Sequence, residues 1–108
     1  MKYWDVRYID EAAKDRDSFD VSARNQIDKA IRKVSQNPLP KNEGGYGVPL
    51  GNKHGNDLTG LCRIKLLKLG IRIVYKIIRD GEIMRIIVIA ARADNEVYKI
   101  AAGRANTL

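Results

Sequence analysis

The sequence predicts an α+β fold in which a short strand and two helices precede three further strands. Apolar residues recur at helical spacing between Val21 and about Gln36. Three later stretches are instead rich in β-branched residues and are separated by turn signals. A chain of 108 residues can bury one core. We therefore expect a single domain over residues 1–108 with the order β-α-α-β-β-β.

Residues that typically begin or end helices and strands set the expected element boundaries in the first half of the chain. Residues 2–9 mix aromatic and β-branched side chains with polar ones and predict the first strand. Asp10 and Asp20 are candidate N-caps of the two helices, and Asn37-Pro38 ends the second. Residues 38–60 are dense in proline and glycine, so we expect a long loop there, a candidate contact for a substrate or partner.

The three later strands are expected at 61–67, 71–78 and 83–91. Asp80-Gly81 is a strong signal for a two-residue hairpin turn, and Leu69-Gly70 separates the first two strands. The expected cross-strand pairs are Tyr75 with Ile86, Ile73 with Val88, and Ile64 with Tyr75. After the third strand, Asp94 or Asn95 could cap a short helix carrying Val97, Tyr98 and Ile100.

In this register the strands have one apolar face and one face that collects basic side chains. The apolar face, taken as the core, consists of Cys62, Ile64, Leu66, Ile71, Ile73, Tyr75, Ile77, Met84, Ile86, Val88 and Ala90. The opposite face carries Arg63, Lys65, Arg72, Lys76 and Arg85 among Leu67, Val74, Ile87 and Ile89. A slip of one residue would bury the basic groups at a large desolvation cost.

Charge and composition narrow the class of protein. The formal net charge is +7, and most of the excess lies in the C-terminal half, which favours a polyanionic partner such as a nucleic acid or an acidic protein. No apolar stretch is long enough to cross a bilayer, and the charged N-terminus does not resemble a secretory signal, so we expect a cytoplasmic protein without a membrane partner. Cys62 is the only cysteine, which excludes an internal disulfide.

Several polar side chains should converge at the Leu69-Gly70 end of the basic face. They are Arg63, Lys65, Arg72, Arg92 and Tyr98. Basic residues on an exposed face often do no more than confer solubility, but their convergence at one edge favours a binding site. Tyr98 could alternatively be a helix aromatic that packs on the sheet.

Three segments resemble the RelE/ParE superfamily of toxins from bacterial type II toxin–antitoxin pairs. They are RIKL at 63–66, GIRIVY at 70–75 and ARADNEVY at 91–98. The resemblance implies a RelE-like core: a twisted, mainly antiparallel sheet with the two N-terminal helices on one face and a short C-terminal helix. It also implies a ribosome-dependent endoribonuclease that cuts mRNA in the decoding site.

The resemblance carries the catalytic roles onto Lys65, Arg72, Arg92 and Tyr98. Cleavage by attack of the RNA 2′-hydroxyl needs a base, for which Lys65 and Tyr98 are candidates, and phosphate ligands, for which Arg72 and Arg92 are suited. Arg63 stands where the best-known RelE type has lysine and is expected to bind the RNA backbone. The remaining expected RNA-binding residues are Lys68, Lys76, Arg85 and His54.

We expect neither a cofactor nor a metal. His54 is the only histidine, and Asp57, Asp80 and Asp94 are scattered among turns and caps rather than paired.

The expected partners are a cognate antitoxin protein, mRNA in the ribosome and ribosomal RNA. Ile78, Ile83 and Ile87 could receive apolar anchors of the antitoxin or the C-terminal helix. Two alternatives stay open: a ParE-like inhibitor of DNA gyrase that cuts nothing, and a module of the same fold that only binds.

Overall fold

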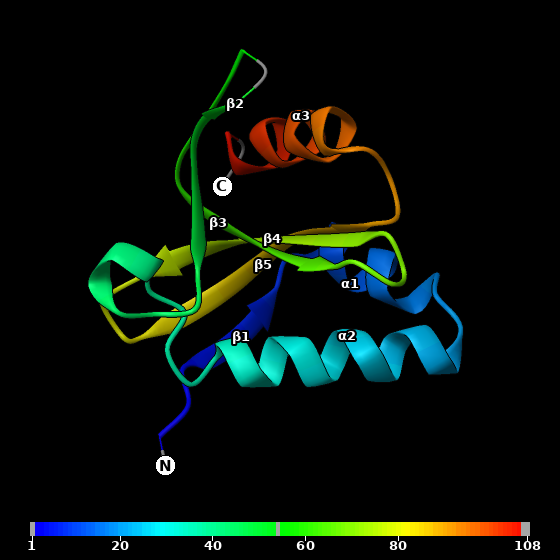
Figure 1. Ribbon diagram of the computed structural model, residues 1–108, viewed down its shortest axis with the longest axis horizontal. Coiled ribbons are helices and arrows are strands. Elements are labelled where there is room, and N and C mark those ends of the chain that lie inside the picture. Colours follow the sequence, from blue (N-terminus) through cyan, green and yellow to red (C-terminus); the bar gives the residue numbers. More distant parts are fainter. Residues whose placement is uncertain (1, 54, 107–108) are drawn as a thin grey trace.

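A five-stranded sheet forms the middle layer of the protein, with α1 and α2 on one face and α3 on the other (Figure 1). The structure is a computed structural model that describes residues 2–53 and 55–106. The strand order is β1-β5-β4-β3-β2; β1 runs parallel to β5, and the other neighbours are antiparallel. The elements are β1 (Asp5–Tyr8), α1 (Asp10–Asp17), α2 (Val21–Val34), a 3₁₀ turn (Lys41–Glu43), β2 (Val48–Lys53), β3 (Asn56–Leu66), β4 (Ile71–Ile78), β5 (Ile83–Ala90) and α3 (Asp94–Ala105). The predicted α+β class is confirmed. Among the described residues, no helix combines the length and apolar character needed to cross a bilayer.

The helix starts are only partly as predicted. Asp20 caps α2, since its Oδ1 accepts a hydrogen bond from the amide of Ala23 at 2.8 Å. Asp10 is not a cap: Ile9 holds that position, and Asp10 lies in the first turn of α1, where its charge complements the helix dipole. Ala93 likewise caps α3 without a side-chain bond, so the expected cap at Asp94 or Asn95 is wrong.

The expected loop over residues 38–60 contains a strand. β2 pairs with β3, which begins at Asn56 rather than at Leu61. Gly51 and Gly60 have φ of 58° and 85°, and the register shifts between Pro49 and Gly51. These glycines bend the hairpin rather than end it, and Pro49 is tolerated because β2 is an edge strand.

Both predicted hairpin registers are correct in part. Tyr75 lies opposite Ile86, as expected from the Asp80-Gly81 turn. Ile64, however, pairs with Ile73 and not with Tyr75, because residues 67–70 form a longer turn than the one assumed. That shift of two residues leaves the side chains of β3 and β4 on their expected faces.

A β-bulge at Ile87 shifts the register of β4 and β5. Val74 pairs with Val88 and Tyr75 with Ile86, so Ile87 is the extra residue, and Ile73 pairs with Ile89 rather than with Val88.

The bulge changes which side chains are buried under which helices. Ile89, expected on the basic face, packs in the core under α1 and α2. Val88 and Ala90, expected in that core, pack on the α3 side. The predicted membership of the core face is therefore wrong beyond the bulge, because one extra residue inverts the alternation.

The α3 side of the sheet is a second core and not a purely polar face. Its buried members are Leu50, Leu58, Leu61, Val74, Ile87, Val88, Val97, Tyr98, Ala101 and Ala102. Tyr98 is 1% exposed, so its expected position outside the core is wrong and the packed-aromatic alternative holds. Ile87 is completely buried in this cluster and offers no surface to a partner.

An ion pair between α1 and α3 satisfies the backbone at the bulge. Asp15 Oδ2 accepts from the amide of Ile89 at 3.0 Å, and Arg104 Nη1 donates to the carbonyl of Ile87 at 3.0 Å. The two side chains also bond each other at 2.6 Å and are about one-fifth exposed. Together they provide backbone hydrogen bonds to the part of β5 that extends past its pairing with β1.

We expect Arg104→Met to lower the free energy of unfolding by about 2–3 kcal/mol, because it leaves Asp15 and the Ile87 carbonyl without their charged donor. Arg79→Met is the matched control, since Arg79 pairs with Glu43 on an exposed surface and its loss should be barely measurable. Urea unfolding followed by circular dichroism measures both. Equal losses in the two variants would contradict the bracing role of Arg104.

Candidate functional site

Three basic side chains meet on the α3 side of the sheet. Lys65 on β3 lies directly opposite Arg72 on β4, and Arg63 lies two residues before Lys65 on the same face. Each side chain is about one-quarter exposed. Like charges in directly opposed positions destabilise a sheet unless an anion compensates them.

Asp94, the first residue of α3, is the anion that compensates them. Its Oδ1 accepts from Arg72 Nε at 2.5 Å, and its Oδ2 accepts from Lys65 Nζ at 3.0 Å. Arg63 Nη1 lies 3.9 Å from the same Oδ2. We call these four residues the Asp94 cluster.

The charges in the Asp94 cluster stabilise the ionised carboxylate. Burial alone would raise the pKa of Asp94, but hydrogen bonds from Arg72 and Lys65, together with their positive charges, lower that pKa below its ordinary value of 3.8. The position at the N-terminus of α3 adds the favourable field of the helix dipole. The cluster is therefore a preorganised site for an anion, at present filled by a side chain of the chain itself.

Tyr98 joins the Asp94 cluster from one turn further along α3. Its hydroxyl oxygen accepts a hydrogen bond from Arg63 Nη1 at 2.7 Å. The ring is buried in the second core, so the hydroxyl has a fixed position. Arg63, Lys65, Arg72 and Tyr98 are thus brought together as the sequence predicted.

Arg92 joins this group only through its backbone. Arg72 Nη1 donates to the carbonyls of Arg92 at 2.9 Å and Gly70 at 3.0 Å, which fixes the Arg72 guanidinium independently of Asp94. The Arg92 side chain instead lies 4.0 Å from Glu96 and is 61% exposed.

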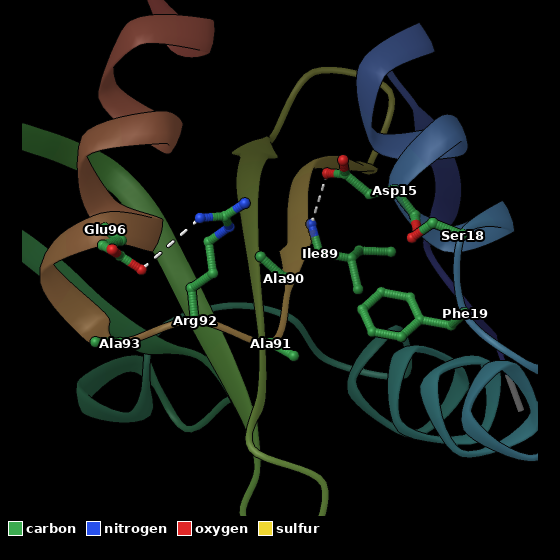
Figure 2. A pocket seen from close by; sticks show the side chains of 9 residues that line it. All are labelled: Asp15, Ser18, Phe19, Ile89, Ala90, Ala91, Arg92, Ala93 and Glu96. Carbon is green, nitrogen blue, oxygen red and sulfur yellow. Dashed lines mark hydrogen bonds and ion pairs between the residues drawn. The ribbon is translucent and has the colours of Figure 1, made fainter.

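The Arg92 side chain lines a hollow between the N-terminus of α3, the end of β5 and α1 (Figure 2). Asp15 of α1, together with Ser18 and Phe19 just after that helix, forms the opposite wall. The expected partnership of Arg92 and Arg72 guanidinium groups is therefore absent from the described structure.

The other expected RNA-binding residues lie around the Asp94 cluster at different places. Lys76 and Arg85 are directly opposed on β4 and β5, further along the same face. Lys68 is exposed in the turn after β3 and lines a groove with Lys65, Leu67 and Leu69. His54 lies outside the described residues.

Asp94 is the site residue that sequence reasoning missed. Its place in the sequence suggests a turn or cap residue like Asp57 and Asp80, but its spacing of four from Tyr98 places both on one face of a helix. Over residues 2–53 and 55–106, no group of three His, Cys, Asp or Glu side chains is arranged to hold a metal ion. Cys62 is buried as predicted, and burial raises the pKa of its thiol.

Comparisons with known proteins agree on the fold. No protein-family model matches the chain. An Escherichia coli protein named a RelE-like toxin is 26% identical over 104 residues, which are 96% of this chain and 98% of that protein.

Solved structures show the same architecture. A double arginine-to-alanine variant of the E. coli toxin RelE in the free state superposes with a TM-score of 0.69 at 23% identity, covering 95% of this chain and 98% of that one. The toxin–antitoxin complex RelBE2 of Mycobacterium tuberculosis gives 0.67 at 21% identity, covering 87% and 97%. The RelE-like fold expected from the sequence is thereby confirmed.

We expect Asp94 to stabilise the fold at neutral pH and to lose that contribution in acid. Because the pKa of Asp94 is depressed in the folded state, the contribution is complete above the ordinary value of 3.8 and is lost as the pH falls through the folded-state pKa. The difference in free energy of unfolding between the parent and Asp94→Asn should therefore be constant above about pH 5 and shrink in stronger acid. Urea unfolding across this pH range measures it, and a difference that persists unchanged in acid would contradict the assignment.

Proposed function

We propose that this chain belongs to the RelE superfamily, is the toxin of a type II toxin–antitoxin pair and cleaves mRNA in the decoding site of the ribosome. The observation that carries the proposal is the Asp94 cluster. Three cations converge on one carboxylate beside a fixed tyrosine hydroxyl. Groups that hold a carboxylate through charged hydrogen bonds also suit a phosphodiester.

Cleavage in this proposal uses the substrate's own nucleophile. A base removes the proton of the RNA 2′-hydroxyl, whose oxygen attacks the adjacent phosphorus. The bond from phosphorus to the 5′-oxygen breaks, and that oxygen takes up a proton, leaving a 2′,3′-cyclic phosphate and a 5′-hydroxyl. The negative charge that accumulates on the phosphoryl oxygens is stabilised by fixed cations.

Exposure distinguishes the two candidate bases, Lys65 and Tyr98. Lys65 is 27% exposed at its side chain and can reach a bound RNA, so we assign proton transfer to it. Arg72, held by two carbonyls, is the phosphate ligand. The hydroxyl of Tyr98 is buried against Arg63, which makes Tyr98 a positioning residue for that guanidinium. Arg92, outside the cluster, would bind a neighbouring phosphate of the RNA.

In this proposal the ribosome aligns the mRNA for cleavage, which the Asp94 cluster does not do alone. None of the proposed groups is a strong base in a fixed position, so the rate depends on holding the 2′-hydroxyl in line with the leaving oxygen. Such alignment is worth roughly 7–11 kcal/mol in favourable cases. The basic surface that includes Lys68, Lys76 and Arg85 would bind mRNA and ribosomal RNA through their phosphates.

An acidic antitoxin is the proposed protein partner, and the cytoplasm, where ribosomes are found, is the proposed location. Two observations support the antitoxin: the chain carries a net charge of +7, and it shares its fold with toxins solved in RelBE complexes. Opposite charge would speed association of the pair.

The proposal predicts new mRNA 5′ ends within translated frames when the chain is induced in cells. Ends should be absent from untranslated RNA, because the ribosome is needed for alignment. Intact mRNA together with arrested DNA replication would contradict the nuclease and favour the gyrase alternative.

The same experiment tests one variant of the Asp94 cluster against a matched control. Arg72→Ala should reduce cleavage by about 100- to 1000-fold, as expected when one fixed donor to a transition-state anion is deleted. Lys76→Ala removes a cation from the same sheet face but outside the Asp94 cluster, so it should cause only a small, salt-sensitive loss. Circular dichroism confirms that both fold, and equal effects would contradict the assignment of Arg72.

A further inference from the structure

We propose that Asp94 is a built-in competitor of the substrate: its carboxylate occupies the place of the RNA phosphate and must be displaced before RNA binds. The inference rests on the proposed function, since it assumes that the Asp94 cluster receives a phosphodiester. It adds an autoinhibitory contact within the chain to that function.

The geometry of the contact is that of a bound oxyanion. Each carboxylate oxygen of Asp94 has its own cationic donor, Arg72 Nε for Oδ1 and Lys65 Nζ for Oδ2, with Arg63 nearby. The two non-bridging oxygens of a phosphodiester can accept hydrogen bonds from the same donors. Carboxylate and phosphate therefore compete for one set of hydrogen bonds.

The Asp94 carboxylate and a phosphate cannot both occupy the cluster without a loss of binding free energy. A phosphate that approached Arg72 while Asp94 remained would place two negative charges within a few ångströms, in a site shielded from solvent on the side of α3. It would also find the Nε donor of Arg72 already used. Binding is thus an exchange of anions rather than an addition.

The fold allows that exchange without unfolding α3. Asp94 is the first residue of the helix and its side chain is 30% exposed, so the carboxylate can rotate into solvent. Val97 and Tyr98 keep the helix packed in the second core. Arg72 keeps its position through the carbonyls of Gly70 and Arg92.

The expected consequence is weak binding of free RNA. A short RNA must displace Asp94 with few other contacts to compensate. An mRNA held in the ribosome brings additional contacts with the surrounding basic surface, and these offset the cost of displacement. Asp94 would thereby favour ribosome-bound substrate over free RNA.

The test compares Asp94→Asn with Glu96→Gln. Both remove one negative charge from the first turn of α3, but the Glu96 side chain is exposed and lies 4.0 Å from Arg92, outside the Asp94 cluster. The probe is a short single-stranded RNA with 2′-O-methyl groups throughout, which lacks a nucleophile, and the readout is fluorescence anisotropy. Asp94→Asn should bind roughly tenfold tighter than the parent, and Glu96→Gln no more than about twofold tighter.

A double-mutant cycle separates competition from loosening of the helix. In an Arg72→Ala background, the gain from Asp94→Asn should largely disappear, because the contested donor is gone. A gain that persists there, or affinities of Asp94→Asn and Glu96→Gln that are equal, would overturn the inference while leaving the proposed function intact. Absence of RNA binding by folded Asp94→Asn would also overturn the inference, whereas a folded parent that leaves ribosome-bound mRNA intact would contradict the proposed function itself.

Discussion

The ionic contact between Asp94 and the paired cations of β3 and β4 is the interaction on which the functional end of the molecule depends. Lys65 and Arg72 face each other across two strands, and their mutual repulsion is relieved by one carboxylate from α3. The contact fixes the start of α3 over the sheet. Tyr98, one turn later, is held by its packing in the second core and lies against Arg63. The Asp94 carboxylate therefore organises the cations that, in the proposed function, bind an RNA phosphate.

The bulge at Ile87 has a comparable effect on the rest of the fold. It transfers Ile89 to the core under α1 and α2, and it leaves Val88 and Ala90 under α3. The Asp15–Arg104 pair completes the hydrogen bonding of the bulged strand and links helices on opposite sides of the sheet. Both helix layers are thus tied to β5, and the chain runs from the end of this strand directly to α3 (Figure 1).

The binary pattern of the sequence predicts α2 and most of the three later strands, because apolar periodicity reports burial directly. It could not reveal the bulge, since one extra residue such as Ile87 leaves no mark in composition. The strand β2 was hidden by Gly51 and Pro49, which signal a loop but are tolerated on a bent edge strand.

The sequence predicts the basic members of the Asp94 cluster, but neither the role of Asp94 nor the burial of Tyr98. The basic residues Arg63, Lys65 and Arg72 follow from strand alternation, so their convergence was foreseeable. An acidic residue at a helix start usually indicates a cap, but here the helix start faces the ends of β3 and β4, where Asp94 compensates the positive charges of Lys65 and Arg72. The burial of Tyr98 is not evident from the sequence, because the second core depends on α3 packing over Val74 and Ile87, a contact without a local sequence signal.

The most direct measurement of the central claim is an electron cryomicroscopy structure of the chain on a ribosome that carries 2′-O-methylated mRNA in the decoding site. The account predicts an mRNA phosphate within hydrogen-bonding distance of the Arg72 guanidinium, with the Asp94 carboxylate rotated away from Lys65 and Arg72. An mRNA that bypasses the Asp94 cluster while Asp94 keeps its bonds to both cations would contradict it.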